Sequence, residues 1–240
     1  MPVEQDKEAM VDHLGFFNER LAARRAVWSL PGFSISPTGG IQKRIFDILL
    51  ASLFLVILSP LFLFAALAIK LCDRGPVFFT HTRIGFLGCP FGCLKFRTMA
   101  IDADERLAAY LAADEEFAAE WATKRKLKAD PRLIRIGAAL RRSSIDELPQ
   151  LINILRGEMS LVGPRPIVAD ELAYYGASAE LYLGARPGLT GAWQVGGRSD
   201  TSYEMRVQMD KNYCLDWSML GDVAIIIKTI PVVFLARGSY

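Results

Sequence analysis

A long apolar run, residues 45–69, constrains this chain more than any other part of its sequence. The run reads IFDILLASLFLVILSPLFLFAALAI, and its only polar side chains are those of Asp47, Ser52 and Ser59. A straight helix over this run would be long enough to cross the roughly 30 Å of hydrocarbon in a bilayer. The whole chain is 52% hydrophobic with a mean hydropathy of +0.24, and the excess lies mainly here. The run therefore predicts a segment that enters a membrane.

Ser59 and Pro60 lie near the middle of the apolar run. Proline removes a backbone hydrogen bond and its ring clashes with the carbonyl four residues earlier, so a sharp bend is expected there. The run either re-enters as a helical hairpin or crosses the bilayer as a kinked span. Sequence physics alone slightly favours the kinked span. Positive charges flank both ends and favour a cytoplasmic location for each of them: Lys43, Arg44, Lys70 and Arg74.

The residues on either side of the run differ in character. Residues 1–40 are polar and charged and contain several prolines and glycines, so they are interpreted as a mobile arm with at most one short helix. They do not form a signal peptide, because the apolar run begins too late in the chain. Residues 73–240 have the composition of a globular domain.

Charge and cysteine usage disfavour several functions. The 28 basic and 26 acidic side chains give a net charge of +2, too nearly neutral to indicate nucleic-acid binding. The four cysteines show neither a disulfide framework nor the spacing of a zinc site, and they are interpreted as reduced thiols. With only His13 and His81 present, a mechanism that needs several imidazoles is disfavoured.

Local patterns after the run predict a mixture of short strands and helices. Residues 77–99 are predicted to form short strands punctuated by glycines. Residues 102–128 are rich in Ala, Glu, Leu and Lys without a breaker and predict a helix with a solvated face. Residues 222–236 are apolar but too short to span a bilayer, so a core helix and an interfacial helix are equally compatible with them.

The segment RRSSIDELPQ is the most informative stretch for chemistry. In one interpretation, Ser144 and Glu147 form a capping box and Glu147 has only a structural role. Against it, Pro149 would fall in the first turns of that helix, which favours a helix that begins nearer Leu148. Asp146 and Glu147 would then lie at a helix amino terminus. Two adjacent carboxylates there suit Mg²⁺ and a substrate phosphate, and one of them suits a nucleophile.

Basic residues gather around this acidic pair and indicate an anion site. Arg165 lies between Pro164 and Pro166, on a stiff backbone that presents its guanidinium in a fixed direction; the alternative is a surface turn with a solvated arginine. Lys95 and Arg97 alternate with an apolar residue, so they are predicted on one strand face, where they either bind a ligand or are merely solvated. The other members of the group are Arg132, Arg135, Arg141 and Arg142.

Two further stretches supply weaker candidates. Residues 186–198, RPGLTGAWQVGGR, combine glycines with Arg186, Gln194 and Arg198. This composition suits a close approach of the backbone to a ligand, although glycine-rich loops more often make turns. Asp210, in MDKNYCLDWS, either reaches the same site or lies on a helix surface.

With these pieces assembled, the chain resembles the bacterial sugar transferase family, whose small monotopic members are polyprenyl-phosphate phosphoglycosyl transferases. The resemblance covers residues 43–236, and DELPQL together with GPRP makes it highly specific. Its departures are small, such as Thr98 where many members carry serine, and they affect no proposed ligand. The matching blocks are KRIFD, the Ser-Pro pair, GPVFFTHTRIG, CLKFRTM, DPRLIRIGAALRRSSIDELPQLINILRGEMSLVGPRP, RPGLTGAWQVGGR and MDKNYCLDWS.

The resemblance implies transfer of a sugar 1-phosphate, of a hexose such as galactose or glucose, from a UDP-sugar to undecaprenyl phosphate in exopolysaccharide biosynthesis. It implies that Asp146 attacks the sugar-bearing phosphorus, releases UMP and becomes a phosphosugar aspartate. It assigns Mg²⁺ to Glu147, with Asp146 beside it. The first candidate for a phosphate ligand is Arg141, followed by Arg165 and Lys95. Further candidates are Arg97, Arg186, Gln194, Arg198 and Asp210.

The expected fold is mixed α/β, predominantly helical with a few short strands. Residues 41–72 are expected to form a re-entrant membrane hairpin broken at the Ser-Pro pair, and residues 73–240 a catalytic domain with interfacial helices at the cytoplasmic face of the bacterial inner membrane. Expected partners are the donor, the acceptor and the lipid bilayer, with other polysaccharide-assembly enzymes or a second copy of the chain as further candidates and no nucleic acid. The alternatives are a nucleotide-sugar hydrolase and a non-catalytic membrane-anchored scaffold.

Overall fold

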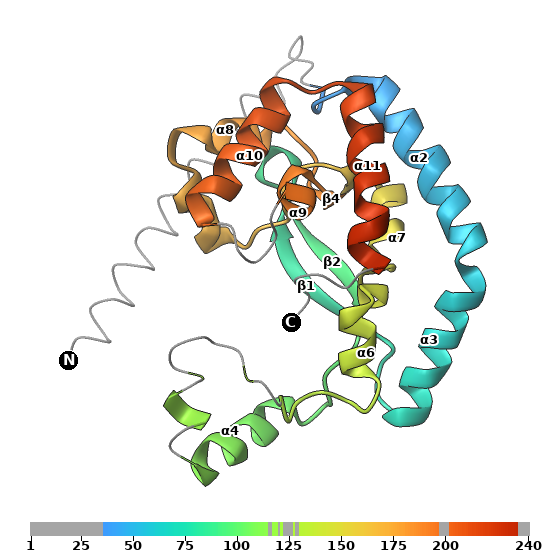
Figure 1. Cartoon of the computed structure of the whole chain (residues 1–240), viewed down its shortest axis with the longest axis vertical. Coiled ribbons are helices and arrows are strands. Elements are labelled where there is room, and N and C mark those ends of the chain that lie inside the picture. The colour runs from blue at the N-terminus through green and yellow to red at the C-terminus, as the bar shows by residue number, and fades with distance from the viewer. Residues whose placement is uncertain are drawn as a thin grey trace, which may run out of the picture.

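The computed structural model describes residues 36–114, 117–119, 121, 127, 130–196 and 202–234. Within them the chain has the mixed, mostly helical architecture that its sequence predicts (Figure 1). The predicted arm, residues 1–40, lies almost wholly outside the described residues. Just before the first long helix, the backbone N–H of Thr38 donates to the carbonyl of Gly184 at 3.0 Å, so the entry to this helix is held against the domain.

Two apolar helices, α2 (Gly40–Ile57) and α3 (Ser59–Cys72), form a bent arc along one side of the molecule (Figure 1). The two helices are bent by 62° at a break directly before Ser59 and Pro60, which confirms the predicted bend. The hydroxyl of Ser59 donates to the carbonyl of Val56 at 2.8 Å and satisfies one acceptor near the break. Among the described residues no single helix is long and apolar enough to cross a membrane, whereas this bent pair meets both criteria when taken together.

The arc has one apolar face that the domain leaves uncovered. Its inner face packs on the domain through Ala51, Ala65 and Ile69, which are buried. An exposed apolar surface of this extent is typical of a site that contacts a membrane or another protein. Its large exposed side chains include those of Leu49, Leu53, Val56, Leu63, Phe64, Leu67 and Leu71.

A buried polar cluster fastens α2 to the rest of the domain. Nζ of Lys43, on α2, lies 2.6 Å from Oδ2 of Asp222, at the start of α11 (Met219–Phe234). Asp47, one turn further along α2, accepts hydrogen bonds from the hydroxyl of Ser160 at 2.7 Å and from a backbone N–H at 3.0 Å. Buried charges are costly unless they are paired, so these contacts fix the position of α2 against the domain.

The strands predicted within residues 77–99 form an antiparallel hairpin. Its parts are β1 (Phe78–Ile84), the 3-10 turn η1 (Phe86–Gly88) and β2 (Pro90–Phe96). The side chain of Asn153 covers the second edge of β2: it accepts from the N–H of Leu94 at 2.9 Å and donates to the carbonyl of Gly92 at 2.8 Å. One amide side chain thus takes the place of a neighbouring strand and docks α7 (Gln150–Arg156) onto the hairpin.

A parallel pair of strands, β3 (Ser160–Val162) and β4 (Gly188–Thr190), lies in the middle of the domain (Figure 1). A core cluster that includes Leu151, Ile154 and Leu161 joins α2, α7, β2 and β3. The remaining elements are α4 (Ala103–Ala113), α6 (Gly137–Arg142), η2 (Ile145–Glu147), η3 (Ala169–Ser178), α8 (Ala179–Leu183), α9 (Ala192–Gly196) and α10 (Tyr203–Leu215).

The helix expected over residues 102–128 is shorter than predicted. α4 ends at Ala113, because Asp114 has an extended backbone. No residue of α4 is buried, so tertiary packing does not hold the segment in one continuous helix. The prediction of an uninterrupted helix is wrong at Asp114, and much of the segment after it lies outside the described residues.

α11 packs against the domain by one face only. Ile225 and Ile226 contact the core, and the hydroxyl of Thr229 lies 2.7 Å from the hydroxyl of Thr190. Among the residues whose burial is described, the helix is covered on one side only, so it is not a fully buried core helix. The opposite face exposes Leu220, Val223, Ile227 and Ile230.

Candidate active site

Asp146 and Glu147 lie in η2, a short 3-10 turn between α6 and α7. The side chain of Ser144 forms no capping hydrogen bond, and its backbone is left-handed with φ 55°, so the capping-box interpretation is wrong. α7 begins at Gln150 with Pro149 as its N-cap, close to the expected start. The acid pair is therefore held in a turn of its own directly before α7, not in the first turn of that helix.

Lys95, on β2, reaches this acid pair, and its Nζ lies 2.6 Å from Oε1 of Glu147. Burial raises the pKa of Asp146 to about 6; the charge of Glu147 adds to this effect, while Lys95 and Arg141 oppose it. Burial by itself would lower the pKa of Lys95, but Glu147 and Asp146 outweigh burial and raise it. At neutral pH the site thus holds an ionised Asp146 that is more basic than an exposed aspartate, beside a charged lysine.

Arg141, near the end of α6, approaches the same carboxylate. Its Nε donates to the hydroxyl of Thr98 at 2.9 Å, which fixes the side chain against the residues after β2. Burial lowers the pKa of the Arg141 guanidinium, and the charge of Asp146 is the main influence that opposes this. The structure thus brings Arg141 and Asp146 together, as the sequence predicts.

A cavity opens beside Glu147 and Lys95, and we call it the acid-pair cavity. Arg83, Lys95 and Arg165 line it with three positive charges, and among the described residues Glu147 is its only acidic lining side chain. Burial lowers the pKa of Arg83, and the charge of Arg165 lowers it further, so these guanidinium groups lie near one another. Crowded like charges favour the binding of an anion. The cavity is also lined by Cys93, Gln150, Pro166, Gly188, Leu189, Trp193 and Gln194.

The loop that carries Arg165 is held by Asp210. Because prolines flank Arg165, its backbone N–H is the only backbone donor among these three residues. This N–H donates to Oδ2 of Asp210 at 3.2 Å, and the hydroxyl of Tyr175 donates to the same oxygen at 2.8 Å. The guanidinium of Arg165 lies 4.9 Å from the centre of the Trp193 ring. Asp210 is buried and, like Asp146, is not among the residues that line the cavity; its hydrogen bond to the backbone N–H of Arg165 gives it a positioning role.

Trp193 and Gln194, both on α9, offer unused hydrogen-bonding atoms at this cavity. Nε2 of Gln194 donates to the carbonyl of Leu189 at 3.0 Å, whereas its Oε1 is buried and has no partner among the described residues. Nε1 of Trp193 is likewise buried and unpartnered within that part of the chain. Buried polar atoms without partners are costly, so the two side chains suit a ligand that carries hydroxyl groups.

Of Lys95 and Arg97, the two phosphate-ligand candidates of this segment, the structure places only Lys95 at the acid-pair cavity. β2 ends at Phe96, and Nη1 of Arg97 lies 2.9 Å from Oδ2 of Asp73, just after α3. Nη2 of the same guanidinium donates to the backbone carbonyl of Asp73 at 3.0 Å. Arg97 therefore links the hairpin to the end of the bent helix pair and is not among the residues that line the acid-pair cavity.

Other basic residues singled out in the sequence also have structural partners. Nε of Arg186 donates to the carbonyl of Gly157 at 2.8 Å, and Arg186 does not line the cavity. Arg132 pairs with Asp130 at 2.7 Å. Arg198 lies outside the described residues.

Sequence reasoning missed Arg83 and Gln150 as ligand candidates, although both line the acid-pair cavity. Arg83 lies on β1, and its Nη1 is 3.6 Å from Oε2 of Glu171. The register of the hairpin places Arg83 on the strand face that carries Lys95. The period-two alternation of the strand was the available signal, but the pairing register, which decides the face, was not visible in the sequence.

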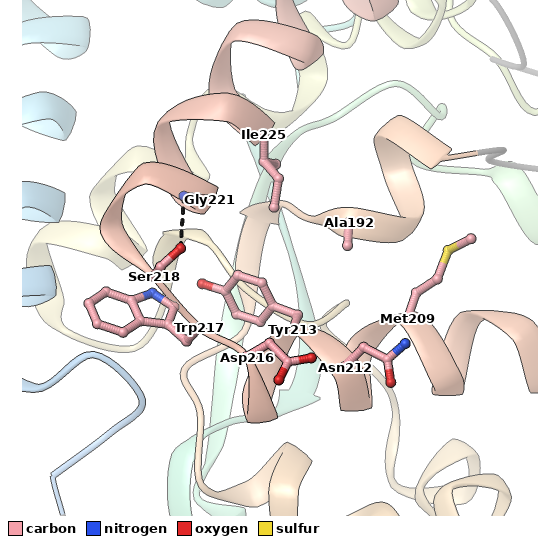
Figure 2. Close-up of a pocket in the computed structure, with 9 residues that line it drawn as sticks. All are labelled: Ala192, Met209, Asn212, Tyr213, Asp216, Trp217, Ser218, Gly221 and Ile225. Carbon is pink, nitrogen blue, oxygen red and sulfur yellow. Dashed lines mark hydrogen bonds between the residues drawn. The ribbon is translucent and has the colours of Figure 1, made fainter.

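A second, larger cavity of about 350 Å³ lies between α9, α10 and α11 (Figure 2). None of the predicted catalytic or phosphate-binding residues that the structure describes lines it. Figure 2 shows Tyr213 and Trp217 beside it, and the single hydroxyl proton of Tyr213 lies within reach of two acceptors, Oδ1 of Asp222 at 2.9 Å and the carbonyl of Val162 at 3.0 Å from the hydroxyl oxygen. Size alone therefore does not mark the active site; the charges and the acid pair select the smaller cavity.

The acid pair fits a divalent cation with hard-oxygen ligands. Asp146 and Glu147 supply two adjacent carboxylates, and Mg²⁺ usually takes one or two carboxylates and completes its shell with water and substrate phosphate. The raised pKa of Asp146, caused by burial and by Glu147, shows that another positive charge would be favourable here. Among the described residues no group of three or more His, Cys, Asp or Glu side chains forms a fuller metal site.

The chain is similar to known sugar transferases over most of its length. The family model of the bacterial sugar transferases matches residues 38–236. The exopolysaccharide production protein ExoY of Sinorhizobium fredii is 53% identical over 207 residues, which cover 86% of this chain and 92% of that protein.

Two further relatives are named for the lipid and sugar that they use. The undecaprenyl-phosphate galactose phosphotransferase of Salmonella typhimurium is 46% identical over 198 residues, 82% of this chain and 41% of that protein. The UDP-glucose:undecaprenyl-phosphate glucose-1-phosphate transferase of Caulobacter vibrioides is 40% identical over 208 residues, 83% of this chain and 72% of that protein. The matching region is thus nearly all of ExoY and less than half of the Salmonella protein.

Proposed function

The chain belongs to the bacterial sugar transferase family, and we propose that it transfers a sugar 1-phosphate from a UDP-sugar to undecaprenyl phosphate and releases UMP. As a phosphoglycosyl transferase it would carry out the first membrane step of exopolysaccharide biosynthesis. The observation that carries the proposal is the acid pair itself. A buried Asp146 lies beside Glu147, whose carboxylate is 2.6 Å from Lys95, at a cavity lined by three cations.

The proposed reaction proceeds by two displacements at one phosphorus atom. In the first, a carboxylate oxygen of Asp146 attacks the sugar-bearing phosphorus, the new O–P bond forms, and the bond to UMP breaks with its electron pair on the departing phosphate. In the second, an oxygen of undecaprenyl phosphate attacks the same phosphorus, and the bond to Asp146 breaks and restores the carboxylate. A pKa of about 6 supports this role, because Asp146 remains ionised at neutral pH but is more basic than usual.

The cations around the acid pair would bind the donor diphosphate and stabilise the charge on the departing UMP. Lys95, Arg83 and Arg165 line the cavity, and Arg141 lies near Asp146. We assign Mg²⁺ to Glu147 and Asp146, and a bound ion would add charge neutralisation at the diphosphate.

The bent helix pair supports a monotopic location at the cytoplasmic face of the bacterial inner membrane. α2 and α3 are apolar and exposed on one face, and their 62° bend suits a hairpin that dips into one leaflet. Basic residues at both ends of the pair, including Lys43 and Lys70, favour the same side of the membrane for both ends. The exposed apolar face of α11 would then lie in the interface.

The proposed sugar is a hexose, galactose or glucose, because the relatives whose names state a sugar use one of these two. The unpartnered Oε1 of Gln194 would accept a hydrogen bond from a sugar hydroxyl, and the unpartnered Nε1–H of Trp193 would donate one. Neither contact separates the two hexoses, which differ only in the orientation of one hydroxyl.

The deciding measurement is UMP release by membrane-extracted protein with Mg²⁺ and a panel of UDP-sugars, in the presence and absence of undecaprenyl phosphate. The wild type is compared with Asp146→Asn, and Asp170→Asn, an exposed aspartate on η3, serves as the matched control. We expect repeated turnover only with the lipid, full activity in Asp170→Asn and none in Asp146→Asn.

Three other results would contradict the proposal. Repeated turnover without lipid would indicate a nucleotide-sugar hydrolase. No release with any UDP-sugar by folded protein would favour a non-catalytic scaffold. Unchanged turnover in Asp146→Asn would exclude Asp146 as the nucleophile.

A further inference from the structure

One face of the β1–β2 hairpin continues beyond the acid-pair cavity. Phe79 on β1 pairs with Lys95 on β2, and His81 pairs with Cys93. Directly paired residues of antiparallel strands project to the same side of the sheet, and so do alternate residues along one strand. Phe79 and His81 therefore share a face with Lys95, Cys93 and Arg83, which line the cavity.

The two rings on this face are open to solvent. Phe79 is 52% exposed and His81 is also exposed, and their ring centres are 6.3 Å apart. On the opposite face Phe78, which is itself 41% exposed, packs on Phe62 of α3 and on Phe96, at 5.9 and 5.6 Å between ring centres, whereas Phe79 has no comparable phenylalanine contact among the described residues. An exposed phenylalanine on an edge strand is a liability for a protein, so its place beside a charged cavity indicates a ligand surface.

His81 is held as a neutral ring with a defined donor. Nη2 of Arg83 lies 3.1 Å from Nδ1 of His81, and because a guanidinium has only donors, Nδ1 is the acceptor. The ring proton is then on Nε2. Burial lowers the pKa of His81, and the charges of Arg83 and Lys95 lower it further, which agrees with a neutral ring. His81 thus offers a flat, uncharged surface with one N–H.

We propose that Phe79 and His81 form the nucleobase subsite for the nucleotide donor. The pyrimidine ring stacks on Phe79, and Nε2–H of His81 donates to a carbonyl of the base or to a ribose hydroxyl. The inference rests on the proposed function and deepens it by placing the base on the strand face directly beside the cations that would hold the diphosphate.

The chemistry of this hairpin face matches the nucleotide sugar better than it matches undecaprenyl phosphate. A nucleotide sugar joins an anionic diphosphate to a flat base, and this hairpin face joins three cations to two flat rings. Stacking on an aromatic side chain is available to any base, because each presents a π-face. Undecaprenyl phosphate also carries an anion whose oxygens accept hydrogen bonds, but it has no aromatic base to stack on Phe79.

The test compares steady-state constants for Phe79→Ala, His81→Ala and Phe79→Trp with those of the wild type. Thr82→Ala is the matched control, since Thr82 is exposed on the same strand but on the opposite face. For Phe79→Ala we expect the KM for the UDP-sugar to rise roughly tenfold with little change in kcat or in the KM for undecaprenyl phosphate. Phe79→Trp retains a ring and is expected to keep a donor KM near that of the wild type.

A change in the ligand tests the same contact without altering the protein. A donor with a saturated 5,6-dihydrouracil base loses aromatic stacking, so wild type is expected to bind it more weakly, whereas Phe79→Ala is expected to bind both donors alike. Equal discrimination by wild type and Phe79→Ala would overturn the proposal.

Other results also separate failure of the subsite from failure of the enzyme assignment. A rise in the KM for undecaprenyl phosphate in Phe79→Ala would show that this face contacts the lipid, and unchanged constants in both variants would exclude any subsite here; either result overturns the inference while the transferase assignment stands. Wild-type protein that turns over no UDP-sugar would overturn both.

Discussion

The carboxylate of Asp210 accepts a hydrogen bond from the backbone N–H of Arg165, and 3.2 Å separates Oδ2 from the nitrogen. The prolines on either side of Arg165 carry no N–H, so this is the only hydrogen bond that a backbone donor of these three residues can make; the carbonyl of Pro164 accepts separately from the N–H of Gly188 at 2.8 Å. The side chain of Arg165 meanwhile stacks on Trp193 and lines the acid-pair cavity. Through Asp210, α10 thus helps to position Arg165, which belongs to a different part of the chain.

Loss of this anchor is expected to weaken donor binding through Arg165. In Asp210→Ala we expect the KM for the UDP-sugar to rise roughly tenfold, about the worth of one hydrogen bond to a charged group. Arg165→Ala is expected to cost at least as much, and the double variant no more than Arg165→Ala alone, because both changes remove the same interaction. Steady-state kinetics of the three variants measures this coupling.

The control for this cycle is Glu204→Gln, an exposed acidic residue in the first turn of α10. It is expected to leave both Michaelis constants unchanged. Additive losses in the double variant would show that Asp210 acts on folding alone and does not position Arg165.

The buried charge of Asp146 is expected to lower the free energy of unfolding at neutral pH. Burial raises its pKa from 3.8 to about 6, so at pH 7 the folded state carries the cost of a buried charge, up to roughly 3 kcal/mol by linkage. Asp146→Asn is expected to abolish turnover and raise the free energy of unfolding by up to this amount at pH 7. Denaturant unfolding in detergent, at several pH values, measures the difference.

The sign of the pH dependence follows from the raised pKa of Asp146. Wild-type stability is expected to fall as pH rises from about 4 to about 6, because the folded state retains a proton that the unfolded state has lost. The asparagine variant lacks this contribution but keeps a similar one from Asp210, whose pKa burial also raises to about 6, and its advantage over wild type vanishes below about pH 4. A variant less stable than wild type at pH 7 would contradict this account.

Features with local causes could be predicted from the sequence. The bend at Pro60 follows from proline geometry, and the acid pair stands out because Asp146 and Glu147 are adjacent. Contacts between distant residues could not be predicted in this way. Nothing near Arg97 in the sequence shows that Asp73 binds it, and nothing near Arg83 shows the hairpin register that brings it to the cavity.

Substitution of Glu147 and substitution of Lys95 are expected to shift the acidic side of the pH–activity profile, its acid limb, in opposite directions. Turnover should fall as pH drops through about 6, where Asp146 becomes protonated. Glu147 raises the pKa of Asp146 and Lys95 lowers it, so Glu147→Gln should shift this limb to lower pH and Lys95→Met to higher pH, by roughly one unit each.

The pH dependence of the first burst of UMP release is the appropriate measurement, because it reports attack by Asp146 before the lipid-dependent step. The two variants need only a measurable residual rate, because the comparison uses the pH at which activity falls and does not use the maximal rate. Shifts in the same direction would show that another group controls the limb.

The ion pair between Lys43 and Asp222 is expected to decide how firmly the bent helix pair is held to the domain. The two charged groups are buried and 2.6 Å apart, and Asp222 also accepts from Tyr213 at 2.9 Å and from Trp217 at 3.1 Å. Lys43→Met leaves the buried carboxylate of Asp222 without its counter-ion and also removes the charge 3.9 Å from Oδ1 of the buried Asp47, so it is expected to lower the free energy of unfolding by about 3–5 kcal/mol.

The double variant Lys43→Met with Asp222→Asn separates lost charge pairing from lost packing. Asparagine carries no charge and has a single acceptor oxygen, which can keep the bond from Tyr213, whereas the bond that Trp217 donates to Oδ2 is lost; the double variant is therefore expected to recover only part of the stability that Lys43→Met loses. Lys70→Met, at the exposed end of α3, should change stability by less than about 0.5 kcal/mol. A double variant no more stable than Lys43→Met would contradict the assignment of this loss to the unpaired charge of Asp222.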